Sequence, residues 1–179
     1  TGDQLSGREG VALLRNDEFV LNPAATRAYR PLAEAMNAGR LGYGIGGPGT
    51  AAQIYGWLKA QGLSNAGAAG VLGNMQQESG FDPTAVQSDG GGGHGLVQWT
   101  GPRWNDLAGF AAGRGTSWTD LGTQLAFLAQ EISAGYGSMW ESLKTASDPV
   151  AASQLFANTF EKPGDYGSRD TFASALFAR

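Results

Sequence analysis

The sequence predicts a mainly α fold: a helical domain that carries a small β-hairpin or loop lobe. After residue 50, apolar side chains recur at intervals of three and four positions, as they do on a helix with one buried face. Between residues 81 and 100 this pattern stops, and four consecutive glycines occupy positions 90–93. The apolar content of 41% is ordinary for a globular protein.

Three zones are expected along the chain. Residues 1–38 form an N-terminal segment, with an extended arm at 18–22 and a short helix that begins near Pro31. Residues 39–49 contain six glycines and a proline, which is the composition of a linker. Residues 50–179 form the compact domain. The chain starts at Thr1 without an initiator Met, so we expect a piece of a longer polypeptide.

Local signals place the helices of the compact domain. Gly62 is a stop for the first helix, and Ser64 or Asn65 caps the second. Asp148 followed by Pro149 is a cap and first-turn signal for another helix. Leucines and an isoleucine spaced for one face define the helix after residue 119. The expected helices span residues 50–62, 65–78, 102–112, 119–134, 138–146, 149–160 and 168–177, and 96–99 is a short extended piece.

Composition restricts the chemistry and the partners. The chain has no cysteine and one histidine, His94, which excludes thiol catalysis and zinc sites built from two or three histidines. No GxSxG motif accompanies His94, so a serine triad is not indicated. The net charge of −4 and the absence of a basic patch argue against nucleic acid, and no apolar run of about 18 residues predicts a membrane span. Catalysis would therefore rest on carboxylates, without a metal or organic cofactor.

Glu78 is the main catalytic candidate. It lies three positions after Met75 and seven after Val71, on the apolar stripe of the helix that it ends. A desolvated carboxylic acid has a raised pKa, so it holds a proton near neutral pH and donates it. A general acid in glycosidic-bond cleavage needs this property. The alternative is a solvated Glu at a helix C-terminus.

Two stretches carry a family resemblance. The run GVLGNMQQESGFDPTAVQ (70–87), followed by GLVQW (95–99), resembles the lysozyme-like superfamily and most closely the phage tail lysozyme domains. FEKPGDYGSR (160–169) and YGSMWESLK (136–144) also look like segments of these domains. The resemblance covers residues 50–179. It implies an α+β lysozyme-like fold in which Glu78 is the catalytic acid, a small β-hairpin faces it across the sugar cleft, and the segment with Gln98 lines that cleft.

A second resemblance concerns the N-terminal zone. Residues 18–40, followed by a glycine-rich stretch, resemble a segment of tape measure proteins from phages of actinobacteria. This implies that the chain is part of a virion tail protein with an embedded lysozyme domain. Residues 1–49 would then contact other tail proteins.

The second catalytic group is open. Asp89 lies in the loop expected to face Glu78, and its alternative role is to open a glycine turn. Asp82 and Asp106 are other candidates, and turn capping is the preferred role of Asp82. Glu161 is a further option, for which pairing with Lys162 or Arg169 is preferred.

Five residues are candidates for contact with the glycan, each with a structural alternative. Ser79 either orients Glu78 or bonds to backbone at the helix end. Gln98 suits N-acetyl and hydroxyl groups, or bonds to loop backbone. Trp99 and Tyr136 stack on a sugar or pack in the core, and the core is preferred for Trp99. His94 is expected to be exposed in a glycine loop.

Three functions are compatible with these patterns. The first is a muramidase that hydrolyses the β-1,4 bond between N-acetylmuramic acid and N-acetylglucosamine in peptidoglycan. The second is a lytic transglycosylase on the same scaffold, which the absence of an AYNAG-type segment disfavours. The third is a tail module that binds glycan or tail subunits without catalysis.

Overall fold

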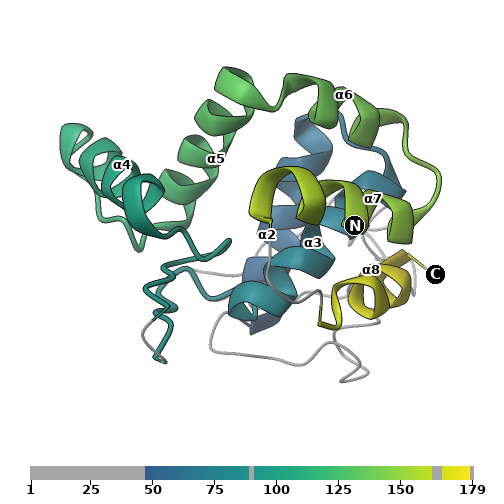
Figure 1. The fold of residues 1–179 in the computed structure, drawn as a ribbon, viewed down its shortest axis with the longest axis horizontal. Coiled ribbons are helices and arrows are strands. Elements are labelled where there is room, and N and C mark those ends of the chain that lie inside the picture. The colour runs from purple at the N-terminus through teal and green to yellow at the C-terminus, as the bar shows by residue number, and fades with distance from the viewer. Residues whose placement is uncertain (1–46, 89–90, 163–166, 178–179) are drawn as a thin grey trace, which may run out of the picture.

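The computed structural model describes residues 47–88, 91–162 and 167–177. The segment expected at 1–38, most of the linker expected at 39–49, and Asp89 lie outside the described residues. The described chain is mainly helical, as the sequence predicts. Its elements are α2 (Gly47–Ala60), α3 (Asn65–Ser79), α4 (Gly101–Gly113), α5 (Leu121–Gly135), α6 (Gly137–Thr145), α7 (Pro149–Phe156), η1 (Ala157–Glu161) and α8 (Arg169–Phe177) (Figure 1).

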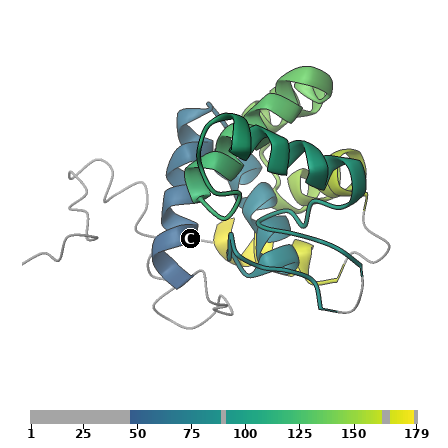
Figure 2. The ribbon, with the colours of Figure 1, turned by 90° about the vertical axis from the view of Figure 1, so that its left-hand side faces the viewer.

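The helix α3 is the centre of the domain. Every residue from Ala66 to Gln76 is buried, and the helix packs against α2, α7 and α8, while α4 and α5 lie to one side (Figures 1 and 2). Two glycines permit the close approach. A Cβ at Gly70 would lie 2.6 Å from the backbone nitrogen of Ser153, and one at Gly73 would lie 2.6 Å from the carbonyl oxygen of Arg169. The first turn of α8 therefore touches the second half of α3.

The caps of α3 explain where the helix starts and stops. The Ser64 hydroxyl accepts a hydrogen bond from the backbone N–H of Gly67 at 2.9 Å, as the sequence predicts. At the other end Gly80 adopts the left-handed conformation with φ 61°. Phe81 follows, also with positive φ (65°), and its ring is buried. The chain thus turns sharply one residue after Ser79 and leaves the last turn of α3 at the domain surface.

Two expected boundaries are wrong. The first helix begins at Gly47, inside the range expected for the linker. The helix expected at 149–160 is α-helical only to Phe156, and Ala157–Glu161 form a π-helical turn. In that turn the backbone N–H of Lys162 donates to the carbonyl of Ala157, five residues earlier. Apolar spacing does not reveal such a change, because both helix types keep one side buried.

The lobe between α3 and α4 is a loop. The described residues contain no strand there, so the structure does not confirm the expected hairpin. They form two isolated antiparallel bridges, Val86 with His94 and His94 with Trp99. The piece expected to be extended is a turn, because Gly95 and Gln98 have φ values of 70° and 49°. These left-handed conformations prevent a regular ladder.

The core is continuous between the helices and this loop. Leu96, Val97 and Trp99 from the loop join the apolar residues of the helices in one buried cluster. No helix in the described part of the chain is long and apolar enough to cross a membrane.

Candidate active site

Glu78 lies in the last turn of α3, at the edge of the buried core. The residues on the preceding turn, Asn74, Met75 and Gln76, are buried, whereas the Glu78 side chain keeps 19% of its surface exposed. The carboxyl group therefore combines a mostly desolvated side chain with an opening to solvent. A proton donor needs both features, because burial favours the protonated acid and access allows a substrate to approach it.

The guanidinium of Arg169 contacts the carboxylate of Glu78. Arg169 is the first residue of α8, its side chain is 4% exposed, and its Nη2 donates to Glu78 Oε1. A neighbouring charge of opposite sign favours the ionised form of a carboxyl group. The sequence offered Arg169 only as a partner for Glu161, because no local pattern links residues that are 91 positions apart.

Glu161 lies on the other side of the same arginine. Its side chain is 3% exposed, and its Oε2 is 3.7 Å from Arg169 Nε. Neither carboxyl oxygen accepts a hydrogen bond from the described residues. Burial raises the pKa of Glu161 to about 8, although the positive charge of Arg103 acts in the opposite direction. Of its two partners expected from the sequence, the structure supports Arg169, and Lys162 is exposed.

Ser79 connects the end of α3 to the loop. Its hydroxyl lies 3.1 Å from the carbonyl oxygen of Met75 and 3.0 Å from that of Leu96. These are the backbone bonds of the structural alternative. They hold the turn at residues 95–98 against the end of the helix that carries Glu78.

Gln98 closes its own turn. Its side-chain amide donates to the carbonyl of Gly95 at 2.9 Å, and a Cβ at Gly93 would lie 2.5 Å from its Oε1. The side chain is half-buried. Gln98 thus makes the backbone bond of its structural alternative, and a role in glycan binding stays a prediction.

Trp99 packs in the core, which is the role that the sequence favours for it over stacking on a sugar. Its side chain is 0% exposed, its ring centroid lies 5.7 Å from that of Phe127, and its Nε1 donates to Glu131 Oε2 at 2.7 Å. A ring with no exposed face offers no surface to a ligand, so Trp99 is a core residue.

His94 is not the exposed loop residue that the sequence predicts. It is half-buried, its ring stacks on Trp104 with centroids 3.8 Å apart, and Trp118 meets its edge at 5.6 Å. Its Nδ1 lies 2.8 Å from the carbonyl oxygen of Gly92. This aromatic cluster joins the loop to α4, which anchors the histidine despite the surrounding glycines.

The remaining candidates have separate positions. Tyr136 is half-buried and packs against Phe160 with centroids 4.9 Å apart, next to Glu161 in sequence. Asp82 is buried and caps its turn, because its Oδ1 accepts hydrogen bonds from the backbone and hydroxyl of Thr84, both at 2.8 Å. Asp106 is exposed on α4.

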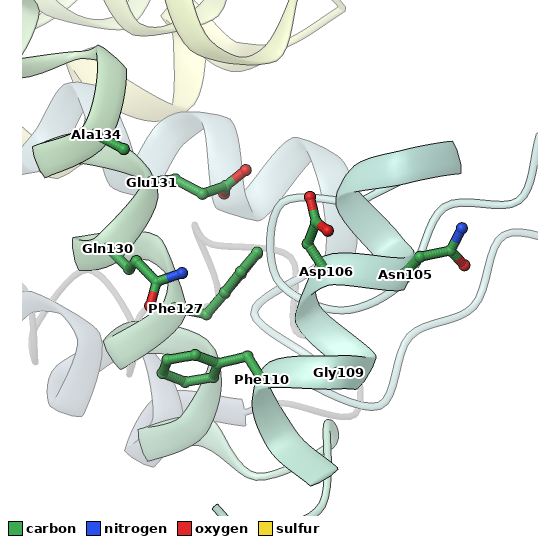
Figure 3. Close-up of a pocket in the computed structure, with 8 residues that line it drawn as sticks. All are labelled: Asn105, Asp106, Gly109, Phe110, Phe127, Gln130, Glu131 and Ala134. Carbon is green, nitrogen blue, oxygen red and sulfur yellow. The ribbon is translucent and has the colours of Figure 1, made fainter. Parts of the chain in front are cut away.

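A pocket of about 420 Å³ opens between α4 and α5. Figure 3 shows the carboxylates of Asp106 and Glu131 facing the space between the two helices, while the amide of Asn105 points away. Arg103 donates two hydrogen bonds to the carboxylate of Glu131, from Nε to Oε1 at 2.6 Å and from Nη2 to Oε2 at 3.0 Å. The guanidinium of Arg103 lies 4.4 Å from the ring centre of Phe160. Arg103 therefore links Glu131, which lines this pocket, to Phe160, the residue before Glu161.

The match to a known family completes this description. The family model described as phage tail lysozyme matches residues 49–178.

The chain belongs to the phage tail lysozyme family. Membership supports a lysozyme-like function in which peptidoglycan is cleaved, and it confirms the resemblance based on the ESG and GLVQW stretches. The tape measure resemblance of residues 18–40 lies outside the matched range and stays a prediction. In the described part of the chain, no group of three or more His, Cys, Asp or Glu side chains is arranged to hold a metal ion.

Proposed function

We propose that this phage tail lysozyme is a muramidase that hydrolyses the β-1,4 bond between N-acetylmuramic acid and N-acetylglucosamine, with Glu78 as the general acid. The observation that carries the proposal is the position of Glu78. Its side chain is 19% exposed in the last turn of α3, just after the buried run from Ala66 to Gln76. The acid donates its proton to the leaving oxygen while the sugar develops oxocarbenium character.

The other proposed site residues have supporting roles. Asp89, or a water held by the loop, acts on the oxocarbenium side of the ring. The turn that contains Gln98 forms one wall of the cleft, and Ser79 fixes that wall to α3 through Leu96. His94 and Tyr136, both half-buried, are the ring-bearing candidates that retain exposed surface for the glycan.

The family supports a proposal for the biological setting. We propose that residues 50–179 are the catalytic domain of a virion tail protein and act on the cell wall during infection. Residues 39–49 are the proposed linker, and residues 1–38 the proposed contact with other tail proteins.

The proposal is tested by loss of turbidity of purified cell walls. Glu78→Gln keeps the size of the side chain but removes the proton donor, so we expect activity to fall by roughly 10²–10⁴-fold. Glu141→Gln is the matched control, because Glu141 is 69% exposed and pairs only with Lys144 among the described residues. Equal activity of the Glu78 variant and the wild type would exclude Glu78 as the acid.

The products distinguish hydrolysis from transglycosylation. A hydrolase releases fragments with reducing muramic acid ends, whereas a transglycosylase gives 1,6-anhydro ends after attack by the C6 hydroxyl. Mass spectrometry of the fragments separates these outcomes. Wall binding without any released fragment would indicate a non-catalytic module.

A further inference from the structure

Two carboxyl groups share one buried arginine. Arg169 reaches Glu78 through Nη2, and its Nε lies 3.7 Å from Oε2 of Glu161. Glu78 belongs to α3 and Glu161 to η1, so α8 brings its guanidinium between two elements that are far apart in the chain. A planar guanidinium presents five N–H groups, enough to serve a carboxylate at each edge.

The two contacts are unequal. The contact with Glu78 is a hydrogen bond, whereas the distance to Glu161 is longer and Nε is not hydrogen-bonded to it. Both oxygens of Glu161 are buried without a hydrogen bond from the described residues. A buried carboxyl group in this state is costly to the fold and calls for an explanation. The neutral acid tolerates it better than the carboxylate, in agreement with a pKa of about 8.

Other charged groups surround the pair. Arg103 from α4 is the cation that acts on Glu161, but its ion pair is with Glu131 on α5. Burial lowers the pKa of Arg169 from its ordinary value, although the adjacent Asp170 acts in the opposite direction. Lys162 and Asp170 adjoin the pair in the sequence, and Tyr136 packs against Phe160, the residue before Glu161.

We propose that Arg169 and Glu161 are positioning residues that control which carboxyl group carries the catalytic proton: Arg169 holds ionised Glu78 in the resting enzyme and turns to Glu161 when Glu78 becomes protonated. The inference rests on the proposed role of Glu78 as the acid. It adds a role for Glu161: this carboxyl group is protonated when Arg169 binds Glu78, and it binds Arg169 when Glu78 is protonated.

The exchange conserves protons and charge. In the resting site Glu161 carries one proton, Glu78 is a carboxylate, and Arg169 neutralises it. A bound glycan removes water from Glu78, which favours the neutral form of this group. One proton then leaves Glu161 and one is gained by Glu78, while the guanidinium moves to the new carboxylate. After Glu78 donates its proton to the glycosidic oxygen, both groups are carboxylates. The water that attacks the sugar carbon releases one proton, which returns to Glu161, and the arginine returns to Glu78.

The first test measures kcat and KM for wall fragments between pH 4 and 9. Glu161→Gln removes the alternative carboxylate, so protonation of Glu78 becomes harder. We expect the alkaline limb of the kcat profile to move about one unit to lower pH, with a roughly tenfold loss near neutral pH and little change in KM. Glu161→Asp should restore part of the shift, and Glu141→Gln should leave the profile unchanged. An unmoved limb with normal kcat in Glu161→Gln would overturn the proposal.

The second test does not require activity. Carbon-13 NMR follows the side-chain carboxyl groups of Glu78 and Glu161 in the wild-type protein as the pH changes, with Glu78→Gln and Arg169→Lys for comparison. Because interacting groups titrate as a pair, each signal should show two steps, and the step due to the partner should vanish in Glu78→Gln. A single independent step for each group would overturn the proposal. By contrast, the muramidase proposal fails if Glu78→Gln lyses walls as the wild type does, whatever the titration shows.

Discussion

At the scale of single residues, Glu161 stands out because both of its carboxyl oxygens are buried without a hydrogen bond from the described residues. Its carboxyl group is buried, and its pKa is raised from an ordinary value of 4.5 to about 8. The folded protein therefore binds a proton at this position more tightly than the unfolded chain does. The resulting stabilisation is complete below about pH 4.5 and is lost as the pH rises toward 8.

This linkage gives a prediction for stability. Glu161→Gln should remove most of the decline in the free energy of unfolding between pH 4.5 and 8, a difference on the order of a few kcal/mol. Chemical denaturation of both proteins at a series of pH values measures it. Glu141→Gln, at an exposed carboxyl group, should follow the wild-type curve. If the Glu161 variant keeps the wild-type slope, the group is not protonated in the folded protein at neutral pH.

At the scale of elements, the contact of α8 with α3 decides where Arg169 is placed. The contact depends on Gly73, which has no side chain to separate the two backbones. A Cβ there would lie 2.6 Å from the Arg169 carbonyl oxygen and 2.8 Å from the backbone nitrogen of Ala173. Both atoms are backbone, so relief requires a shift of the whole of α8.

We expect Gly73→Ala to lower the free energy of unfolding by roughly 1–3 kcal/mol. Because the displaced helix carries Arg169, wall lysis should fall as well. The matched control is Gly109→Ala on α4, where a Cβ meets nothing within 4 Å. That change should stabilise the protein by roughly 0.5–1 kcal/mol, since alanine is the better helix former. Denaturation curves of the two variants compare them directly, and equal stabilities would contradict the close contact.

At the scale of the whole molecule, the buried cluster draws its members from residues 51–176. The matched family range, 49–178, coincides with this cluster. We therefore predict that a chain without residues 1–46 melts at the same temperature as the full chain and still lyses purified walls. Calorimetry and the turbidity assay measure both. A lower melting temperature would show that the N-terminal segment stabilises the catalytic domain.

The fold was predictable in those parts that local rules govern. Helix periodicity and the caps at Ser64 and Asp148 identified most helices to within a few residues. Glu78 became the catalytic candidate because its place on an apolar stripe is itself a local pattern. The contact between Glu78 and Arg169 could not be read from the sequence, because it depends on how distant elements pack.

The π-helical turn at Ala157–Glu161 has a consequence for comparing this chain with its relatives. A π turn contains one residue more than the α turn it replaces, and single π turns often occur at functional sites. A relative with an uninterrupted α-helix here would have one residue fewer, and its alignment would show a single gap just before the acidic position. An alignment that ignores the gap would match Glu161 to a residue of the relative that is one position out of register. The gap would therefore identify relatives in which the turn that carries Glu161 is α-helical.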